Sequence, residues 1–191
     1  MIRNVITFCA LIGLSTTALA LKTGDKAPDF KLTDTQGATH SLSAQQGKWV
    51  VLEWYNPTCP FVVRHYEKQT MTKLASEFGA KGVQWFAVDS SHFVTANSGK
   101  DFEAKHSIKH PVLLDADGTV GRKYGAKTTP HMYVIDPSGV LRYMGAIDDD
   151  PWGDKTKKNY VRNALTDGLA GKSIQTSETK PYGCSVKYKS K

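Results

Sequence analysis

The pattern of apolar and polar positions predicts a mixed α/β domain. Residues 24–42 hold two short alternating runs separated by turn residues, as in a β-hairpin. Residues 48–56 (KWVVLEWYN) and 83–89 (VQWFAVD) are nearly continuous β-branched and aromatic runs, which is typical of strands buried on both faces. Between them, near-helical spacing of apolar residues predicts one helix over 60–78, with Pro60 in its first turn.

The second half of the chain predicts shorter elements and ends on a polar tail. The pattern indicates helices within 98–108 and 118–126 and a short strand within 110–115. An antiparallel hairpin is expected from residues 131–147, with its turn at Pro137-Ser138-Gly139. A closing amphipathic helix over 154–172 is stopped by Gly171, and the polar tail over 176–191 is expected to drape over the surface.

The first twenty residues have the composition of a cleaved secretory signal peptide. Arg3 supplies positive charge, an apolar run follows, and the small residues Ala18 and Ala20 precede Leu21. That apolar run is too short for a stable membrane span, and no later run reaches the roughly 18 apolar residues needed. The chain therefore divides into a signal peptide (1–20), a domain (21–175) and a tail (176–191). We expect an exported, periplasmic protein without stable membrane insertion.

Composition narrows the functional classes. The 191 residues suffice for one domain with a core, and 40% hydrophobic and 23% charged residues are typical of a globular protein. The formal charge is +7, or +6 without Arg3. Its basic residues are scattered rather than gathered into a stripe with aromatic residues, so no nucleic-acid partner is expected.

Two cysteines remain once Cys9 leaves with the signal peptide, namely Cys59 and Cys184. In an oxidising compartment they can pair with each other, or one can react with another molecule. Cys59 lies where the first buried strand meets the helix opened by Pro60, so unpaired backbone N–H groups and the helix dipole favour its thiolate. The alternative is an inert buried cysteine. Without a second ligand nearby in the sequence, we expect neither a metal nor another cofactor.

Five stretches together resemble a known family. The sequences DKAPDFKLTDTQG, VVLEWYNPTCPFVVRHY, TTPHMYVIDPSGVLRYMGAIDD, KNYVRNAL and KPYGCSVKY resemble exported thioredoxin-like proteins of the redoxin (alkyl hydroperoxide reductase/thiol-specific antioxidant) class. The resemblance covers essentially the whole mature chain. It implies a thioredoxin-like α/β fold, with a central mixed β-sheet flanked by helices and a peroxiredoxin-type insertion between Asp89 and Thr129.

Two departures prevent either mechanism of that class from being carried over whole. Thioredoxin-type reductases have two cysteines two residues apart, whereas Val62 stands at the second position here. The corresponding motif of peroxiredoxins is P-x-x-x-T-x-x-C, whose threonine helps to hold the peroxide. Here Asn56 stands three residues before the cysteine and Pro57 two before it.

The resemblance assigns roles to residues around the cysteine. Pro130 matches the cis-proline that faces the redox cysteine, where backbone groups of Thr129 would pair with an extended substrate. Glu53 matches the buried acid that shuttles protons for the thiol, and the alternative is a strand-end glutamate that reaches solvent or a lysine. From the residues themselves, Asn56 is expected to cap the turn or orient a substrate, and Thr58 to cap the helix.

Together these features predict an exported thiol-disulfide oxidoreductase. Cys59 would attack a disulfide or oxidised sulfur of a protein or small molecule, and a second thiol would resolve the mixed disulfide. Cys184 is the candidate for this second thiol within the mature chain, and an external thiol is the alternative. The electron donor is expected to be a thiol of unknown identity. The rival enzyme is a peroxiredoxin-like peroxidase in which Cys59 becomes a sulfenic acid. The non-enzymatic rival is a binding module that uses the groove around Thr129-Pro130.

Overall fold

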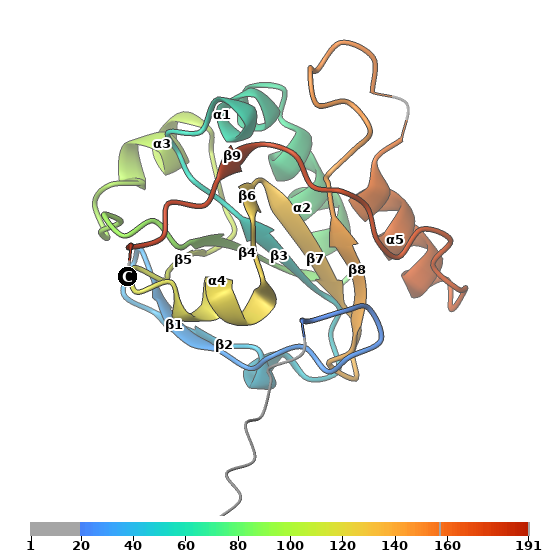
Figure 1. The fold of residues 1–191 in the computed structure, drawn as a ribbon. Helices are drawn as coiled ribbons and strands as arrows, with labels where there is room; N and C mark the ends of the chain where they lie inside the picture. The colour runs from blue at the N-terminus through green and yellow to red at the C-terminus, as the bar shows by residue number, and fades with distance from the viewer. Residues whose placement is uncertain (1–19, 157, 191) are drawn as a thin grey trace, which may run out of the picture.

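The computed structural model describes residues 20–156 and 158–190 and has a seven-stranded mixed sheet at its centre (Figure 1). Along the chain its strands are β1 (Lys31–Asp34), β2 (Thr39–Ser41), β3 (Val50–Trp54), β4 (Gln84–Asp89), β5 (Val112–Leu114), β7 (His131–Ile135) and β8 (Leu141–Gly145). Across the sheet the order is β2-β1-β5-β4-β3-β7-β8. Strands β3, β4 and β5 are parallel, and the other neighbours are antiparallel. Strands β6 (Thr128–Thr129) and β9 (Cys184–Ser185) pair as a separate ribbon.

Helices cover both faces of the sheet. They are η1 (Ser43–Gln45), α1 (Pro60–Glu67), α2 (Thr70–Gly79), α3 (Lys100–Lys105), α4 (Thr119–Tyr124) and α5 (Tyr160–Leu169). Val51 and Tyr55 pack in one core with side chains of α1, α2 and α5, whereas Leu52 and Trp54 pack in a second core with α4. This alternation follows from the two-residue period of a strand. Strand β3 is therefore buried on both faces, as its apolar run predicts.

Most predicted elements are present, and two helices differ from the prediction. The helix expected over 60–78 is two helices, α1 and α2. It breaks because Gln69 has a φ of 57°, in the left-handed region where a right-handed helix does not continue. The closing helix, expected over 154–172, begins only at Tyr160. There the side chain of Asn159 caps it by accepting a hydrogen bond from the Arg162 backbone N–H at 2.8 Å.

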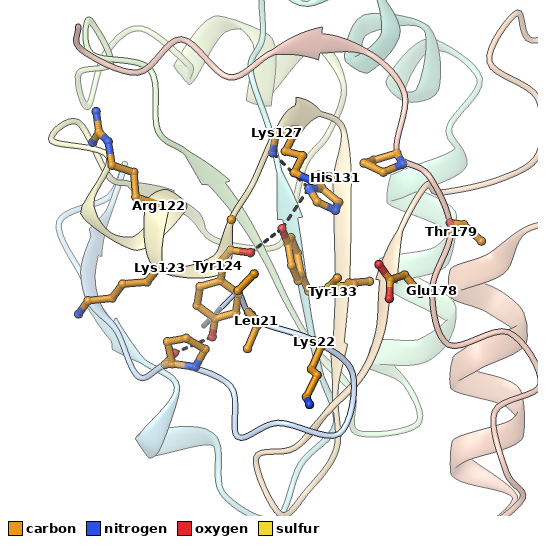
Figure 2. A pocket seen from close by; sticks show the side chains of 15 residues that line it. Leu21, Lys22, Arg122, Lys123, Tyr124, Lys127, His131, Tyr133, Glu178 and Thr179 are labelled. Atoms are coloured by element: carbon orange, nitrogen blue, oxygen red, sulfur yellow. Dashed lines mark hydrogen bonds between the residues drawn. The ribbon is translucent and has the colours of Figure 1, made fainter. Parts of the chain in front are cut away.

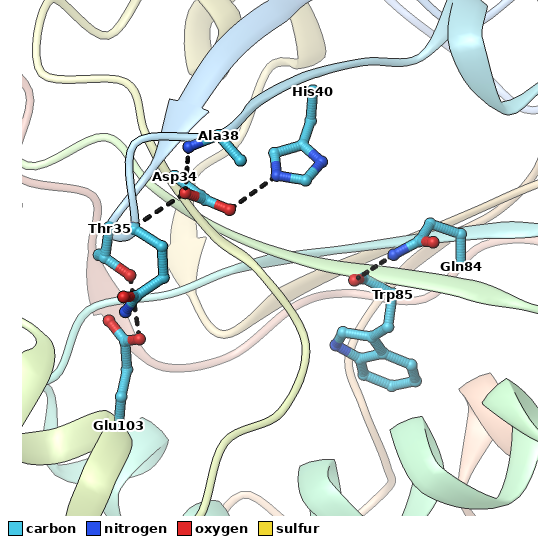
Figure 3. A network of polar contacts seen from close by, with 8 residues as sticks. Asp34, Thr35, Ala38, His40, Gln84, Trp85 and Glu103 are labelled. Atoms are coloured by element: carbon cyan, nitrogen blue, oxygen red, sulfur yellow. Dashed lines mark hydrogen bonds and ion pairs between the residues drawn. The ribbon is translucent and has the colours of Figure 1, made fainter.

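The hairpin of β1 and β2 is held by the carboxylate of Asp34 (Figure 3). This carboxylate accepts a hydrogen bond from the Ala38 backbone N–H at 2.9 Å and lies 2.7 Å from Nε2 of His40. Burial alone would raise the pKa of Asp34, but these partners lower it below its usual range. The neighbouring Thr35 hydroxyl donates to Glu103 at 3.0 Å, which ties the hairpin to α3.

The C-terminal segment crosses the molecule from α5 toward α4 (Figure 1). Residues 176–190, hereafter the strap, first bond to β8. The Thr179 N–H donates to the Met144 carbonyl, and the Met144 N–H donates to the Ser177 carbonyl, both at 3.1 Å. Farther on, β9 pairs with β6, and the Val186 N–H donates to the Lys127 carbonyl at 3.1 Å. The predicted surface tail is thus hydrogen-bonded to the rest of the domain at several points.

No helix within residues 20–156 and 158–190 is long and apolar enough to cross a membrane. The predicted signal peptide, residues 1–20, lies outside the described residues except for Ala20.

Candidate active site

Cys59 stands where the chain leaves β3 and enters α1. It is the N-cap residue of α1, with extended backbone angles, and Pro60 follows at the first helical position. The side chain belongs to the core on the α1 side of the sheet and is 2% exposed. The predicted position of this thiol at a strand-to-helix corner is confirmed.

The Cys59 sulfur has two close partners from distant parts of the chain. Its Sγ lies 2.8 Å from Sγ of Cys184 and 3.0 Å from the carbonyl oxygen of Thr129. Both cysteines are free thiols in this structure. For comparison, a covalent S–S bond measures about 2.03–2.05 Å. The strap therefore brings the Cys184 thiol into direct contact with the Cys59 thiol.

Backbone pairing between β6 and β9 places the second thiol. Cys184 stands opposite Thr129 in this antiparallel ribbon. The preceding Gly183 has a φ of +135°, and a Cβ atom there would lie 2.1 Å from the Thr129 carbonyl oxygen. Only glycine allows so close an approach. The Thr129–Pro130 peptide bond is cis, as predicted. The edge of Thr129 that the resemblance assigns to an extended substrate is occupied here by the strap.

The two thiols differ in how readily they ionise. Burial alone would raise the pKa of the Cys59 thiol. Hydrogen bonds with the Cys184 side chain and the Val62 backbone outweigh burial and hold the pKa of Cys59 below its usual range. Burial and the neighbouring Cys59 sulfur raise the pKa of Cys184 to about 11. Cys59 is therefore the thiol that ionises first, and the Cys184 thiol stays protonated beside it.

Asn56 fixes the turn that precedes Cys59. Its Oδ1 accepts hydrogen bonds from the backbone N–H and the hydroxyl of Thr58, both at 2.7 Å. Its Nδ2 donates to the Ser91 hydroxyl at 3.0 Å. The expectation that Thr58 caps α1 is wrong, because its hydroxyl bonds to Asn56 and the N-cap position belongs to Cys59. Asn56 caps the turn, which is one of the two roles expected for it.

Glu53 is completely buried in the middle of β3. Its Oε2 accepts hydrogen bonds from the Tyr66 hydroxyl and the Trp85 indole N–H, each at 3.1 Å. Burial raises the pKa of this carboxyl to about 8, although both hydrogen bonds act in the opposite direction. The Tyr66 hydroxyl also lies 3.2 Å from Nε2 of His110. The Tyr66 hydroxyl thus links Glu53 to His110, and none of these hydrogen bonds reaches Cys59.

A cavity of about 650 Å³ lies beside the strap, between α4 and β7 (Figure 2). Tyr124, His131, Tyr133 and Pro181 are among its lining residues. Nδ1 of His131 accepts a hydrogen bond from the Lys127 backbone N–H at 3.3 Å and lies 3.0 Å from the Tyr133 hydroxyl. Burial lowers the pKa of His131 to about 3, so the ring is neutral near pH 7. The ring is held in this network.

Tyr182, His65 and Asp148 meet beside the strap, and the sequence predicts no role for them. The Tyr182 hydroxyl donates a hydrogen bond to Oδ1 of Asp148 and lies 3.0 Å from Nε2 of His65. The Tyr182 ring packs beside Phe61 of α1, with ring centroids 6.0 Å apart. The place of Tyr182 two residues before Cys184 was the one available signal.

Across residues 20–156 and 158–190, no group of three or more His, Cys, Asp or Glu side chains could hold a metal ion.

Named relatives share the reaction class expected from the sequence. The chain is 28% identical over 136 residues to the thiol-disulfide oxidoreductase ResA of Bacillus thuringiensis, covering 71% of this chain and 76% of the relative. It is 29% identical over 129 residues to the protein of the same name from Geobacillus kaustophilus, covering 68% of this chain and 72% of the relative.

Solved structures share the fold. A hypothetical protein from Sinorhizobium meliloti is 26% identical with a TM-score of 0.82, over 91% of this chain and 98% of the other. A putative thiol:disulfide interchange protein DsbE from Chlorobium tepidum is 25% identical with a TM-score of 0.62, over 80% of this chain and 98% of the other. The predicted thioredoxin-like fold is thus confirmed. The model of the AhpC/TSA family matches residues 23–144, and the chain belongs to that family.

Proposed function

We propose that the protein is a thiol-disulfide oxidoreductase whose redox pair is Cys59 and Cys184. The observation that carries the proposal is the distance of 2.8 Å between the two Sγ atoms. The lowered pKa of Cys59 suits it to nucleophilic attack, and relatives named thiol-disulfide oxidoreductases support the reaction class.

The cycle consists of two exchanges at the Cys59 sulfur. The Cys59 thiolate attacks one sulfur of a substrate disulfide, and the substrate S–S bond breaks. A mixed disulfide forms, while the other substrate sulfur leaves and takes up a proton. The Cys184 thiol then loses its proton and attacks the Cys59 sulfur, which releases the second substrate thiol and leaves a Cys59–Cys184 disulfide. Two electrons have passed to the substrate. An external thiol donor then reduces the Cys59–Cys184 disulfide with two electrons of its own. A more oxidising partner drives the same steps backwards.

The neighbouring residues have supporting roles in this proposal. Thr129 and Pro130 form the substrate side of the site next to Cys59, and Asn56 with Thr58 holds the turn that faces the substrate. We assign Glu53 the role of proton relay. The support is that burial brings its pKa to about 8, where a carboxyl can both give and take a proton near neutral pH.

The proposal extends to location and partners. Residues 1–20 would be a signal peptide that directs export to the periplasm. Residues 21–175 would be the catalytic domain, and residues 176–191 the segment that supplies Cys184. The charged, apolar and small-residue pattern at the N-terminus supports export. The partners would be an oxidised protein or small-molecule disulfide and a thiol electron donor.

The deciding experiment compares two oxidants on the fully reduced protein. Stopped-flow rates of Cys59 oxidation by a model disulfide and by hydrogen peroxide would be measured at equal concentrations, with the products identified by mass analysis. We expect the disulfide to react faster. Cys184→Ser should stop at the mixed disulfide, and Cys59→Ser should not react. A clearly faster reaction with peroxide would replace the proposal with a peroxidase. Partner binding that is lost only when the groove around Thr129-Pro130 is altered, with Cys59→Ser silent, would favour the binding module.

A further inference from the structure

Cys184 and a substrate sulfur need the same place beside Cys59. The Cys59 side chain is 2% exposed, and the Cys184 sulfur lies against it at 2.8 Å. Strand β9 also occupies the backbone edge of Thr129. Since disulfide exchange requires the attacking thiolate to contact a substrate sulfur directly, the strap must move before Cys59 can react with another molecule.

The strap is held on both sides of Cys184. Upstream, the Thr179 hydroxyl accepts a hydrogen bond from the Ala146 N–H at 2.9 Å. Downstream, the Val186 N–H donates to the Lys127 carbonyl at 3.1 Å. Between Thr179 and Cys184 lies Tyr182, two residues before Cys184. It contacts Phe61 and His65 of α1, the helix opened by Cys59.

Tyr182 joins the strap to two other segments. Its hydroxyl donates a hydrogen bond to the carboxylate of Asp148, in the loop after β8. The hydroxyl oxygen is therefore the acceptor in the 3.0 Å contact with His65, whose Nε2 carries the proton. Burial and the charges of Arg64 and Lys68 lower the pKa of His65 to about 4, so its ring is neutral and Nε2–H is the tautomer that fits this contact.

We infer that Tyr182 is a positioning residue, a latch that holds the strap closed and controls access of substrate to Cys59. The inference rests on the proposed function of the cysteine pair. The latch has opposite effects on the two exchanges. It slows the first, because it keeps Cys184 in the place of the substrate, and it speeds the second, because it raises the effective concentration of Cys184 at the Cys59 sulfur. A general loss of stability would not change the two exchanges in opposite directions.

The test uses Tyr182→Phe, which keeps the ring and removes both hydrogen bonds. In a Cys184→Ser background, the rate of mixed disulfide formation between Cys59 and oxidised glutathione is expected to rise several-fold. With both cysteines present, equilibration against glutathione buffers should show a roughly tenfold lower effective concentration of Cys184, which corresponds to a potential about 30 mV higher. Asp148→Ala, which removes the acceptor instead, should give the same two changes.

The matched control is Tyr160→Phe. Tyr160 lies in α5 and stacks on Tyr143, outside the strap, so neither quantity should change. Unchanged rates and potentials in both Tyr182→Phe and Asp148→Ala would overturn the latch, and so would a slower first exchange with a lower Tm. A wild-type protein that forms no Cys59–Cys184 disulfide in these buffers would overturn the proposed function instead, so the two failures are distinguishable.

Discussion

The Sγ atoms of Cys59 and Cys184 lie 2.8 Å apart although the two residues are 125 positions apart in the chain. The entropy of closing such a loop grows only logarithmically with its length, and the folded domain already fixes both ends. One end is fixed by α1 and the other by the pairing of β9 with β6. Thioredoxin-type reductases take their second cysteine from the helix itself. Val62 stands at that position here, and the strap supplies a thiol from the opposite end of the chain.

Mild oxidation is expected to join Cys59 to Cys184 within one molecule. Non-reducing peptide mapping should recover a single linked peptide pair, absent from Cys59→Ser and Cys184→Ser. The crosslink restricts the unfolded chain, and the loop-entropy model gives about 4–5 kcal/mol for a loop of this length. Oxidised protein should therefore have a higher Tm than reduced protein. Oxidation that yields only intermolecular dimers or sulfinic acid would contradict the pairing.

Cys59 is expected to be unusually acidic for a cysteine. Its hydrogen bonds and its place at the start of α1 favour the thiolate, whereas burial favours the neutral thiol. Cys184→Ser keeps a hydroxyl at position 184 that can replace the hydrogen bond of the lost thiol. In Cys184→Ser, where Cys59 is the one cysteine left in residues 21–191, the rate of iodoacetamide alkylation should reach half its plateau clearly below pH ~8.5. Urea-unfolded protein supplies the reference titration. A folded midpoint at or above that reference would remove the argument for an activated thiol.

Local patterns in the sequence predicted the reactive corner and much of the sheet. The runs that became β3 and β4 have the composition of doubly buried strands, and the burial of Glu53 followed from its place within one of them. The break between α1 and α2 had no such signal, because Gln69 carries no strong preference for its left-handed conformation. The strap contacts were equally hidden. The residues that Tyr182 meets, His65 and Asp148, are 117 and 34 positions away, beyond the reach of any local periodicity.

The stability of the protein is expected to fall as pH rises through the titration of Glu53. Burial raises its folded-state pKa from 4.5 to about 8, so the folded carboxyl keeps a proton that the unfolded chain has already lost. The free energy of unfolding should therefore decrease between those two pH values, by a few kcal/mol in total. Glu53→Gln cannot ionise and keeps an oxygen for Tyr66 and Trp85. Urea unfolding at several pH values should show a much weaker decrease in this variant, and parallel curves would contradict a protonated Glu53.

The proposed proton relay makes a separate kinetic prediction. Glu53→Gln should slow turnover with a disulfide substrate near neutral pH by about tenfold or more, while circular dichroism shows the fold intact. Glu103→Gln is the matched control. Burial also raises the pKa of Glu103, but its contact is Thr35 in the N-terminal hairpin, so turnover should not change. An unchanged rate for Glu53→Gln across roughly pH 6 to 9, where an acid of this pKa and a thiol both titrate, would leave Glu53 a structural residue.

Gly183→Ala is expected to separate the two cysteines. The new Cβ would lie 2.1 Å from the Thr129 carbonyl oxygen, and the φ of +135° is strained for alanine, so β9 must move away from β6. The effective concentration of Cys184 at Cys59, measured in glutathione buffers, should fall by at least about tenfold, with a potential at least 30 mV higher. Alkylation of Cys59 should become faster, because the strap no longer covers its sulfur.

Gly171→Ala is the matched control for this prediction. Gly171 also has a positive φ, +68°, but nothing lies within 4 Å of a Cβ built there. Alanine should cost about 1 kcal/mol of stability at this position and leave the potential of the cysteine pair unchanged. The comparison isolates the contact with Thr129 from backbone strain, which both variants share. If Gly183→Ala kept the wild-type potential and alkylation rate, the β6–β9 ribbon would not be what holds Cys184 against Cys59.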